Sequence, residues 1–138
     1  YRVGAIKQVT IKEDPGYRVY VSVDGGLSDN PRPSLYDAKY EAIIANRATS
    51  PANMVVTVTG KHCETDTLIQ DTIITRPVEG DIMAVYSTGA YNYSMSSNYN
   101  RLPRPAAVIV SGGRAELIIR RETMEDLVSH DEIPERLR

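Results

Sequence analysis

The segment GKHCETD, residues 60–66, contains the only cysteine in the chain, with an ionisable side chain on each side of it. His62 precedes Cys63 and Glu64 follows it, so three groups that exchange protons are consecutive. A free thiol has a pKa near ~8.5 and can donate a proton or, once deprotonated, act as a nucleophile. Many cysteines are inert core side chains, but the charged neighbours favour a polar strand end for Cys63. Cys63 is therefore a candidate for acid or nucleophilic chemistry.

A metal site is another use that this segment could have, and the spacing argues against it. Zinc sites need three or four ligands that converge on one point. Consecutive side chains diverge along an extended chain, and His130 is the only other histidine. We predict no metal site and expect no role of its own for His62.

A second candidate group is Arg32, which stands between Pro31 and Pro33 in the segment DGGLSDNPRPSLY. The two prolines stiffen the backbone and remove it from a sheet ladder. The planar guanidinium can bind a carboxylate or a phosphate through two hydrogen bonds. An exposed arginine in a turn would have the same sequence, so Arg32 alone does not define a site.

A third polar segment, GAYNYSMSSNYNRLPRP at residues 89–105, holds three tyrosines among serine, asparagine and glycine. Tyr91, Tyr93 and Tyr99 could line the edge of a core, with each phenol bonded to a partner. Alternatively, the turn at Gly89 could lead into a helix start whose backbone N–H groups bind an anion. The three segments supply polar loops, but no complete active site.

The elements that would position these loops are short strands. Apolar and polar residues alternate in YRVYVSV at residues 17–23 and in LYDAKYEAII at residues 35–44, as in half-buried strands. Gly112 and Gly113 favour a hairpin turn, because glycine accepts a positive φ, and a further turn is expected at residues 13–16. Other expected strands are YRVGAIKQV, NMVVTVTG, TLIQDTIIT, DIMAVYS, AAVIV and AELIIRR.

We therefore predict an all-β fold for residues 1–138, a Greek-key-like barrel or sandwich of about eight short strands. One or two short helices complete the prediction. One lies within GAYNYSMSSNYN, and the other is RETMEDLVSH, where Thr123 can cap a first turn that carries Glu125 and Asp126. The chain opens on a strand pattern at Tyr1, so we expect a fragment of a longer protein.

Composition and charge exclude several classes of function. The 138 residues are 41% hydrophobic and 25% charged, with a net charge of −2, as in an ordinary globular protein. No basic excess predicts nucleic acid as a partner, and no apolar run approaches the ~18 residues of a membrane helix. A single cysteine cannot form a disulfide within the chain, which favours a cytoplasmic protein.

Three segments in order resemble the C-terminal β-domain of the diaminopimelate decarboxylase family. They are VDGGLSDNPRPSLYDAKYEAIIANR, GKHCE and TGAYNYSMSSNYNRLPRPA, and the resemblance runs from residue 1 to residue 127. This family is one of the fold-type III pyridoxal-phosphate decarboxylases, the alanine-racemase-like group. Three long motifs in the same order make the resemblance specific.

The resemblance implies a two-domain enzyme that decarboxylates meso-2,6-diaminopimelate to L-lysine, the last step of lysine biosynthesis. A (β/α)₈ barrel, absent from this chain, would hold pyridoxal 5′-phosphate and the Schiff-base lysine. The β-domain would complete active sites that lie at a homodimer interface. None of the four lysines of this chain matches the Schiff-base position, so the fragment alone is expected to be inactive.

Five residues match functional positions of the family. Arg32 and Tyr36 match residues that bind the distal end of the substrate, and Glu64 matches the carboxylate at its distal amino group. Cys63 matches the thiol assigned as proton donor. Tyr91 matches a tyrosine that touches both substrate and cofactor.

The chain departs from the family after Glu64. Family members usually read Cys-Glu-Ser-Gly-Asp, whereas this chain reads CETDT. Thr65 can replace the serine hydroxyl, and Asp66 can tolerate the left-handed backbone of a glycine better than most residues, so the shape of the loop after Glu64 stays open. Asp37 stands where small residues are usual, on the polar face of an expected strand, and no function is assigned to it.

Two alternatives stay open from the sequence. One is a sister decarboxylase that acts on carboxynorspermidine, ornithine or arginine. The other is a non-catalytic β-module for binding or assembly. Diaminopimelate is favoured because its distal end carries both a carboxylate and an ammonium group, which Arg32 and Glu64 would bind as a pair.

Overall fold

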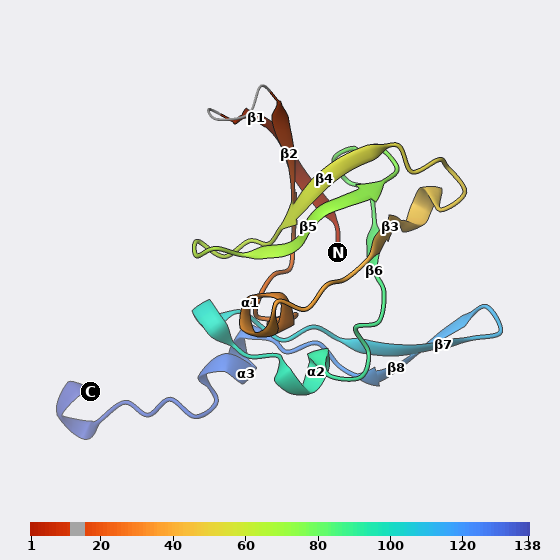
Figure 1. Ribbon diagram of the computed structural model, residues 1–138. Coiled ribbons are helices and arrows are strands. Elements are labelled where there is room, and N and C mark those ends of the chain that lie inside the picture. The colour runs from red at the N-terminus through yellow and green to blue at the C-terminus, as the bar shows by residue number, and fades with distance from the viewer. Residues whose placement is uncertain (12–15) are drawn as a thin grey trace. The chain divides into compact units, whose positions relative to one another are not determined.

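The computed structural model describes residues 1–11 and 16–138. The turn predicted at residues 13–16 therefore lies outside the described residues, apart from Gly16. The chain divides into two compact units, Tyr1–Ser96 and Ser97–Arg138. The helices and strands of both units are labelled in Figure 1.

The first unit contains two sheets (Figure 1). The larger sheet has the order β1-β2-β4-β5, in which β2 and β4 are parallel and the other neighbours are antiparallel. The smaller sheet pairs β3 with β6 in antiparallel fashion. The strands are β1 (Val3–Thr10), β2 (Tyr17–Val23), β3 (Ala42–Ile44), β4 (Met54–Thr59), β5 (Thr67–Ile74) and β6 (Met83–Val85).

Both sheets contribute to one hydrophobic core. The predicted alternation holds in β2, where Val19, Val21 and Val23 are buried and the residues between them are partly exposed. Ile44 from β3 and Met83 from β6 join the same cluster. Because two sheets share this core, the first unit is sandwich-like. The other members of the cluster are Val3, Ala42, Val56, Val58, Leu68, Ile69 and Ile74.

The expectation of one strand over residues 35–44 is wrong for its first half. The chain forms a short helix, α1 (Arg32–Tyr36), and only Ala42–Ile44 is strand. Proline has the backbone φ of a helix, and Pro33 lies in the first turn of α1, after Pro31 at the N-cap position. Asp37 ends the helix with φ 51°, so it is a left-handed cap instead of a position on a strand. Tyr36 consequently does not share a strand face with Ile44.

A partly buried ion pair between Arg47 and Asp81 joins the short 3₁₀ helix η1 (Ala45–Arg47) to the segment before β6. Asp81 is 4% exposed and accepts hydrogen bonds from Arg47, from Asn46 Nδ2 at 2.9 Å and from the Val78 N–H at 2.8 Å. These donors stabilise the ionised form. The Arg47 hydrogen bond, followed by those of Asn46 and Val78, lowers the pKa of Asp81 to about 2 despite burial.

The second unit is built on the predicted hairpin. Strands β7 (Ala107–Ser111) and β8 (Arg114–Ile119) are antiparallel, and Ser111 pairs with Arg114 across the turn. Gly112 and Gly113 have φ values of 56° and 74°, the positive pair that a tight hairpin turn requires. The unit also contains the 3₁₀ helices η2 (Tyr99–Arg101) and η3 (Glu135–Leu137).

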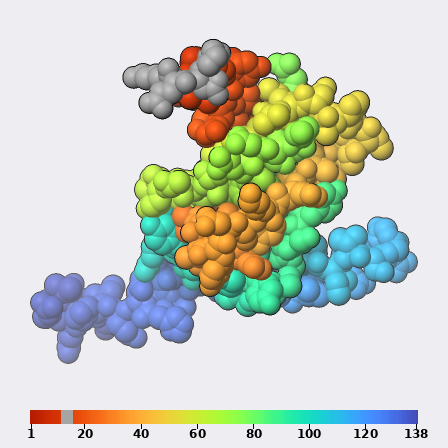
Figure 2. All heavy atoms as spheres, in the orientation of Figure 1, coloured from red at the N-terminus to blue at the C-terminus, as the bar shows by residue number. Residues whose placement is uncertain are grey.

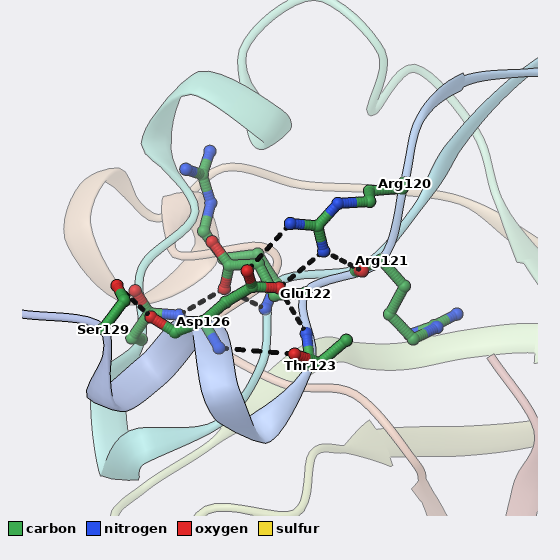
Figure 3. Close-up of polar contacts among 8 residues, drawn as sticks. Arg120, Arg121, Glu122, Thr123, Asp126 and Ser129 are labelled. Carbon is green, nitrogen blue, oxygen red and sulfur yellow. Dashed lines mark hydrogen bonds and ion pairs between the residues drawn. The ribbon is translucent and has the colours of Figure 1, made fainter.

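The helix predicted near the C-terminus forms as α3 (Met124–Val128), and its cap is shown in Figure 3. Thr123 Oγ1 accepts from the Asp126 N–H at 3.3 Å, while Asp126 Oδ2 accepts from the Thr123 N–H at 2.7 Å. Arg120 donates two further bonds to the same carboxylate, at 2.5 and 2.8 Å. The Arg120 hydrogen bonds hold the pKa of Asp126 well below its ordinary value.

The all-β prediction with eight strands is confirmed. The strands of the described residues pair as open sheets, without a closed barrel. Helices are more numerous than predicted: α1 was not expected, whereas α2 (Asn92–Met95) and α3 lie in the two predicted segments. In the part of the chain that the structure describes, no helix has the length and apolar character to cross a membrane.

Candidate functional site

Cys63 and Glu64 lie together at the tip of the loop between β4 and β5. Both side chains are exposed, and Cys63 Sγ donates to Glu64 Oε1 over 3.4 Å. In Figure 2 the yellow-green atoms of this loop form a projection from the first unit. The expectation that Cys63 stands outside the core is confirmed. A thiol in this position can exchange its proton with water or with a bound molecule.

Two buried polar residues flank this exposed pair. Asp66 is 5% exposed, and its carboxylate accepts the Leu27 N–H at 2.8 Å and the His62 N–H at 3.1 Å. His62 is 8% exposed, and its Nε2 accepts the Ser28 N–H at 3.2 Å. The β4–β5 loop is therefore bonded to residues 24–30, the glycine-containing loop that precedes α1.

The left-handed backbone that Asp66 could tolerate is not the one that it adopts. Asp66 does not have a positive φ, whereas Asp37, Asp71, Ser87, Asn100 and Arg101 do. The residue is held by its side chain, because both carboxylate oxygens accept backbone N–H groups. In this loop aspartate thus serves as a hydrogen-bond acceptor and not as a substitute for glycine.

Arg32 and Tyr91 form the second pair. Arg32 is the first residue of α1, and Tyr91 is the residue before α2. The guanidinium carbon of Arg32 lies 4.7 Å from the centre of the Tyr91 ring, within the range of a cation–π interaction. Tyr91 is 59% exposed and Arg32 is half-buried. The contact orients the planar guanidinium over the ring and leaves the phenol accessible.

Tyr36 stands on the same helix as Arg32 and is 64% exposed. Residues four positions apart lie on one face of a helix, so α1 presents both side chains on the same side. The sequence had placed Tyr36 on a strand, but the helix still groups it with Arg32. The orange atoms of this segment are in front in Figure 2.

The base of α2 is anchored in the first unit by a buried amide. Asn92 is 8% exposed, and its Oδ1 accepts from the Tyr40 hydroxyl at 3.4 Å. Helix α2 has only four residues, so its dipole is too small to make the turn at Gly89 an anion site by itself. The chemistry of this segment therefore rests on the Tyr91 side chain.

The structure thus brings the five predicted residues into two groups, on different segments of the first unit. Cys63 and Glu64 lie on the β4–β5 loop, and Arg32, Tyr36 and Tyr91 lie on α1 and at the start of α2. Hydrogen bonds of His62 and Asp66 hold the first group, and the contact between Arg32 and Tyr91 links the second. Within the described residues, no three His, Cys, Asp or Glu side chains are arranged to hold a metal ion.

Comparison with known proteins decides the family. Residues 1–89 match the family model described as "Pyridoxal-dependent decarboxylase, C-terminal sheet domain". The chain belongs to this family. The resemblance found in the sequence is thereby confirmed.

Two curated relatives of this sheet domain are each named diaminopimelate decarboxylase. The protein from Synechocystis sp. is 53% identical over 99% of this chain, which covers 28% of that protein. The protein from Bacillus subtilis is 52% identical over 95% of this chain and 29% of its own length. The chain therefore spans less than a third of the length of these relatives.

Solved structures agree with this assignment. The diaminopimelate decarboxylase of M. jannaschii has a TM-score of 0.86 and 32% identity, and the match covers 99% of this chain and 30% of that chain. The Helicobacter pylori enzyme in complex with L-lysine has a TM-score of 0.75 and 31% identity, over 93% of this chain and 30% of that chain.

The side chains of the sheet domain fit an edge contact with a pyridoxal group, the cofactor that the family description implies. The exposed phenol of Tyr91 and the guanidinium of Arg32 are suited to an anionic, aromatic ligand. A lysine that binds such a cofactor is normally desolvated. The described lysines, Lys7, Lys39 and Lys61, are all exposed. Tyr91 and Arg32 therefore suit a contribution to the cofactor site, whereas the described lysines do not.

Proposed function

We propose that this chain is the C-terminal sheet domain of a diaminopimelate decarboxylase, which converts meso-2,6-diaminopimelate to L-lysine and CO₂. The observation that carries the proposal is the 53% identity to a protein of that name over 99% of the chain. In this proposal residues 1–138 act as one domain, and a preceding (β/α)₈ barrel holds most of the cofactor site.

The cofactor would be pyridoxal 5′-phosphate, and Tyr91 is the residue of this chain that would contact it. When bound, this group supplies an electron sink for the pair left behind by CO₂. The sheet domain then has two tasks, which are to orient the substrate and to deliver a proton to the carbon that has lost its carboxylate.

Cys63 is the proton donor in this proposal. Its thiol is at the tip of an exposed loop, where a substrate from outside the domain can reach it. A thiol is acidic enough to donate to a carbanion-like centre and is reprotonated by water afterwards. In the absence of substrate the thiol donates to Glu64 Oε1 over 3.4 Å, and this hydrogen bond must break before the proton passes to the substrate.

Arg32, Tyr36 and Glu64 would recognise the distal end of the substrate. That end of diaminopimelate carries a carboxylate and an ammonium group. The guanidinium fork of Arg32 matches the carboxylate, while the Glu64 carboxylate matches the ammonium group. Ornithine and arginine lack a distal carboxylate, so either substrate would leave Arg32 unpaired on closure of the site, at a cost of about 1–3 kcal/mol or more.

The two groups of residues lie on separate loops, which supports a site that two subunits share. We place the active enzyme as a homodimer in which the Cys63–Glu64 loop of one subunit serves its partner. A biosynthetic enzyme with a free exposed thiol fits the reducing cytoplasm.

The proposal is tested with the longer protein that contains this chain. It should form L-lysine from diaminopimelate when pyridoxal 5′-phosphate is added, and it should turn over ornithine far more slowly. The 138-residue chain alone should show neither activity nor a cofactor absorbance band. A preference for ornithine would overturn the substrate assignment. Folded, cofactor-loaded protein without any decarboxylase activity would favour a binding module instead.

A further inference from the structure

The Cys63 loop has an unusual distribution of burial for a surface loop. His62 and Asp66 are buried, whereas the three residues between them are exposed. Buried polar groups are costly unless they form hydrogen bonds. Both residues form theirs with backbone groups of another loop, residues 24–30. The exposed residues 63–65 therefore lie between two buried, hydrogen-bonded residues, His62 and Asp66.

Asp66 is one of these two residues. Its carboxylate bonds the Leu27 and His62 N–H groups, and its backbone oxygen accepts the Gly60 N–H at 2.7 Å. A Cβ added to Gly26 or Gly60 would lie 2.2 or 2.0 Å from Asp66 Oδ2. The two loops approach so closely at this carboxylate that only glycine fits beside it.

His62 is the other. A backbone N–H is always a donor, so the bond from Ser28 N–H requires a lone pair on His62 Nε2. Ser28 Oγ lies 3.0 Å from the same nitrogen, and Ser28 is 3% exposed. A side chain without an acceptor at this position would leave the Ser28 N–H buried and unsatisfied.

We propose that His62 and Asp66 are positioning residues that hold Cys63 Sγ and the Glu64 carboxylate at the tip of the loop. They do not touch the substrate in this account; they act by restricting the backbone on either side of the two groups that do. The effect that we expect on catalysis rests on the proposed function, in which Cys63 transfers the proton. The mobility of the loop can be measured whether or not the protein has enzymatic activity.

Four variants distinguish a loss of the hydrogen bonds that hold the loop from a general loss of folding stability. His62→Leu removes the acceptor for Ser28, and Asp66→Asn replaces one accepting oxygen by a donor that faces an N–H group. His62→Gln restores an acceptor near the position of Nε2. Thr57→Val is the matched control, because Thr57 is 2% exposed in β4 and its hydroxyl bonds Asp71, away from the loop.

A nitroxide attached to Cys63, the only cysteine of the 138-residue chain, reports the mobility of the loop directly. We expect His62→Leu and Asp66→Asn to sharpen the electron paramagnetic resonance lines at room temperature. His62→Gln should remain close to the unsubstituted chain, and Thr57→Val should lose stability without a change in line shape. Line shapes that do not differ between His62→Leu and Thr57→Val overturn the anchoring.

The second measurement uses the longer, unlabelled enzyme. The same two variants should lower kcat on the order of 10- to 100-fold, since small displacements of a reacting group have effects of this size. KM should change less, and His62→Gln should recover most of the loss. A mobile loop with unchanged kcat overturns the positioning role. If the unsubstituted enzyme is inactive, the proposed function fails, and the nitroxide spectra still decide whether His62 and Asp66 restrict the loop.

Discussion

The guanidinium of Arg32 rests on the ring of Tyr91, with 4.7 Å between the guanidinium carbon and the ring centre. The contact joins the start of α1 to the start of α2 and orients two of the residues that we assign to the substrate. A planar cation held against an aromatic face keeps its N–H edge available for a bidentate partner. The binding of the distal carboxylate should therefore depend on both side chains.

Arg32→Leu should raise KM for diaminopimelate by about 10-fold or more, because the distal carboxylate loses its charged partner. Arg32→Lys keeps the charge but not the fork, so it should recover only part of the loss. The measurement is steady-state kinetics of the longer enzyme. Arg76→Leu is the control, since Arg76 is exposed outside both groups of site residues. An unchanged KM in Arg32→Leu would remove this residue from the site.

Tyr91→Phe and Tyr91→Leu should separate the two contributions of the tyrosine. Phenylalanine keeps the ring under Arg32 and loses only the hydroxyl, whereas leucine also loses the cation–π contact, worth about 0.5–1 kcal/mol at an exposed site. We expect both variants to bind the cofactor more weakly, and only Tyr91→Leu to affect Arg32. A double-mutant cycle with Arg32→Leu measures this coupling, and additive effects would contradict it.

Asp81 should make the stability of the first unit depend on acid. Its pKa is lowered to about 2 in the folded chain, chiefly by Arg47, from an ordinary value near ~3.9. The ionised carboxylate therefore stabilises the fold above pH ~4, and this contribution of about 2 kcal/mol is lost as the pH falls towards 2.

Denaturant unfolding of the 138-residue chain at pH 7 and at pH 2 checks this. Asp81→Asn should lower the free energy of unfolding at pH 7, and the difference from the unsubstituted chain should shrink at pH 2. Glu79→Gln is a control that should show little of this trend, because Glu79 is exposed nearby. A difference that does not depend on pH would mean that Asp81 acts through packing and not through its charge.

Local patterns predicted much of the fold because the interactions behind them are local. The alternation of valines in β2, the Gly112-Gly113 turn and the Thr123 cap each depend on neighbouring residues. The strand expected over residues 35–44 was wrong in its first part, because residues 35–36 end α1 and residues 37–41 form no regular element. The informative signal there was Pro33, which lies in the first turn of α1, where the fixed φ of proline suits a helix.

The sequence predicted which residues form the candidate site, but it did not predict the hydrogen bonds that hold the Cys63–Glu64 loop in place. Nothing adjacent to His62 or Asp66 in the sequence indicates that their partners are Ser28 and Leu27 in another loop. Such partners follow from how β2 lies beside β4 in the sheet, and a long-range pairing of this kind leaves no periodic trace. Sequence reasoning consequently treated His62 as without a role of its own and left open the shape of the loop after Glu64.

The most direct test of the account is the turnover of diaminopimelate by the longer enzyme with and without the Cys63 thiol. Cys63→Ala should lower kcat by on the order of 100-fold or more, as expected for loss of a general acid, while KM changes little. Cys63→Ser, a much weaker acid of nearly the same shape, should recover little of the rate. A Cys63→Ala enzyme that forms L-lysine at the unsubstituted rate would contradict the account.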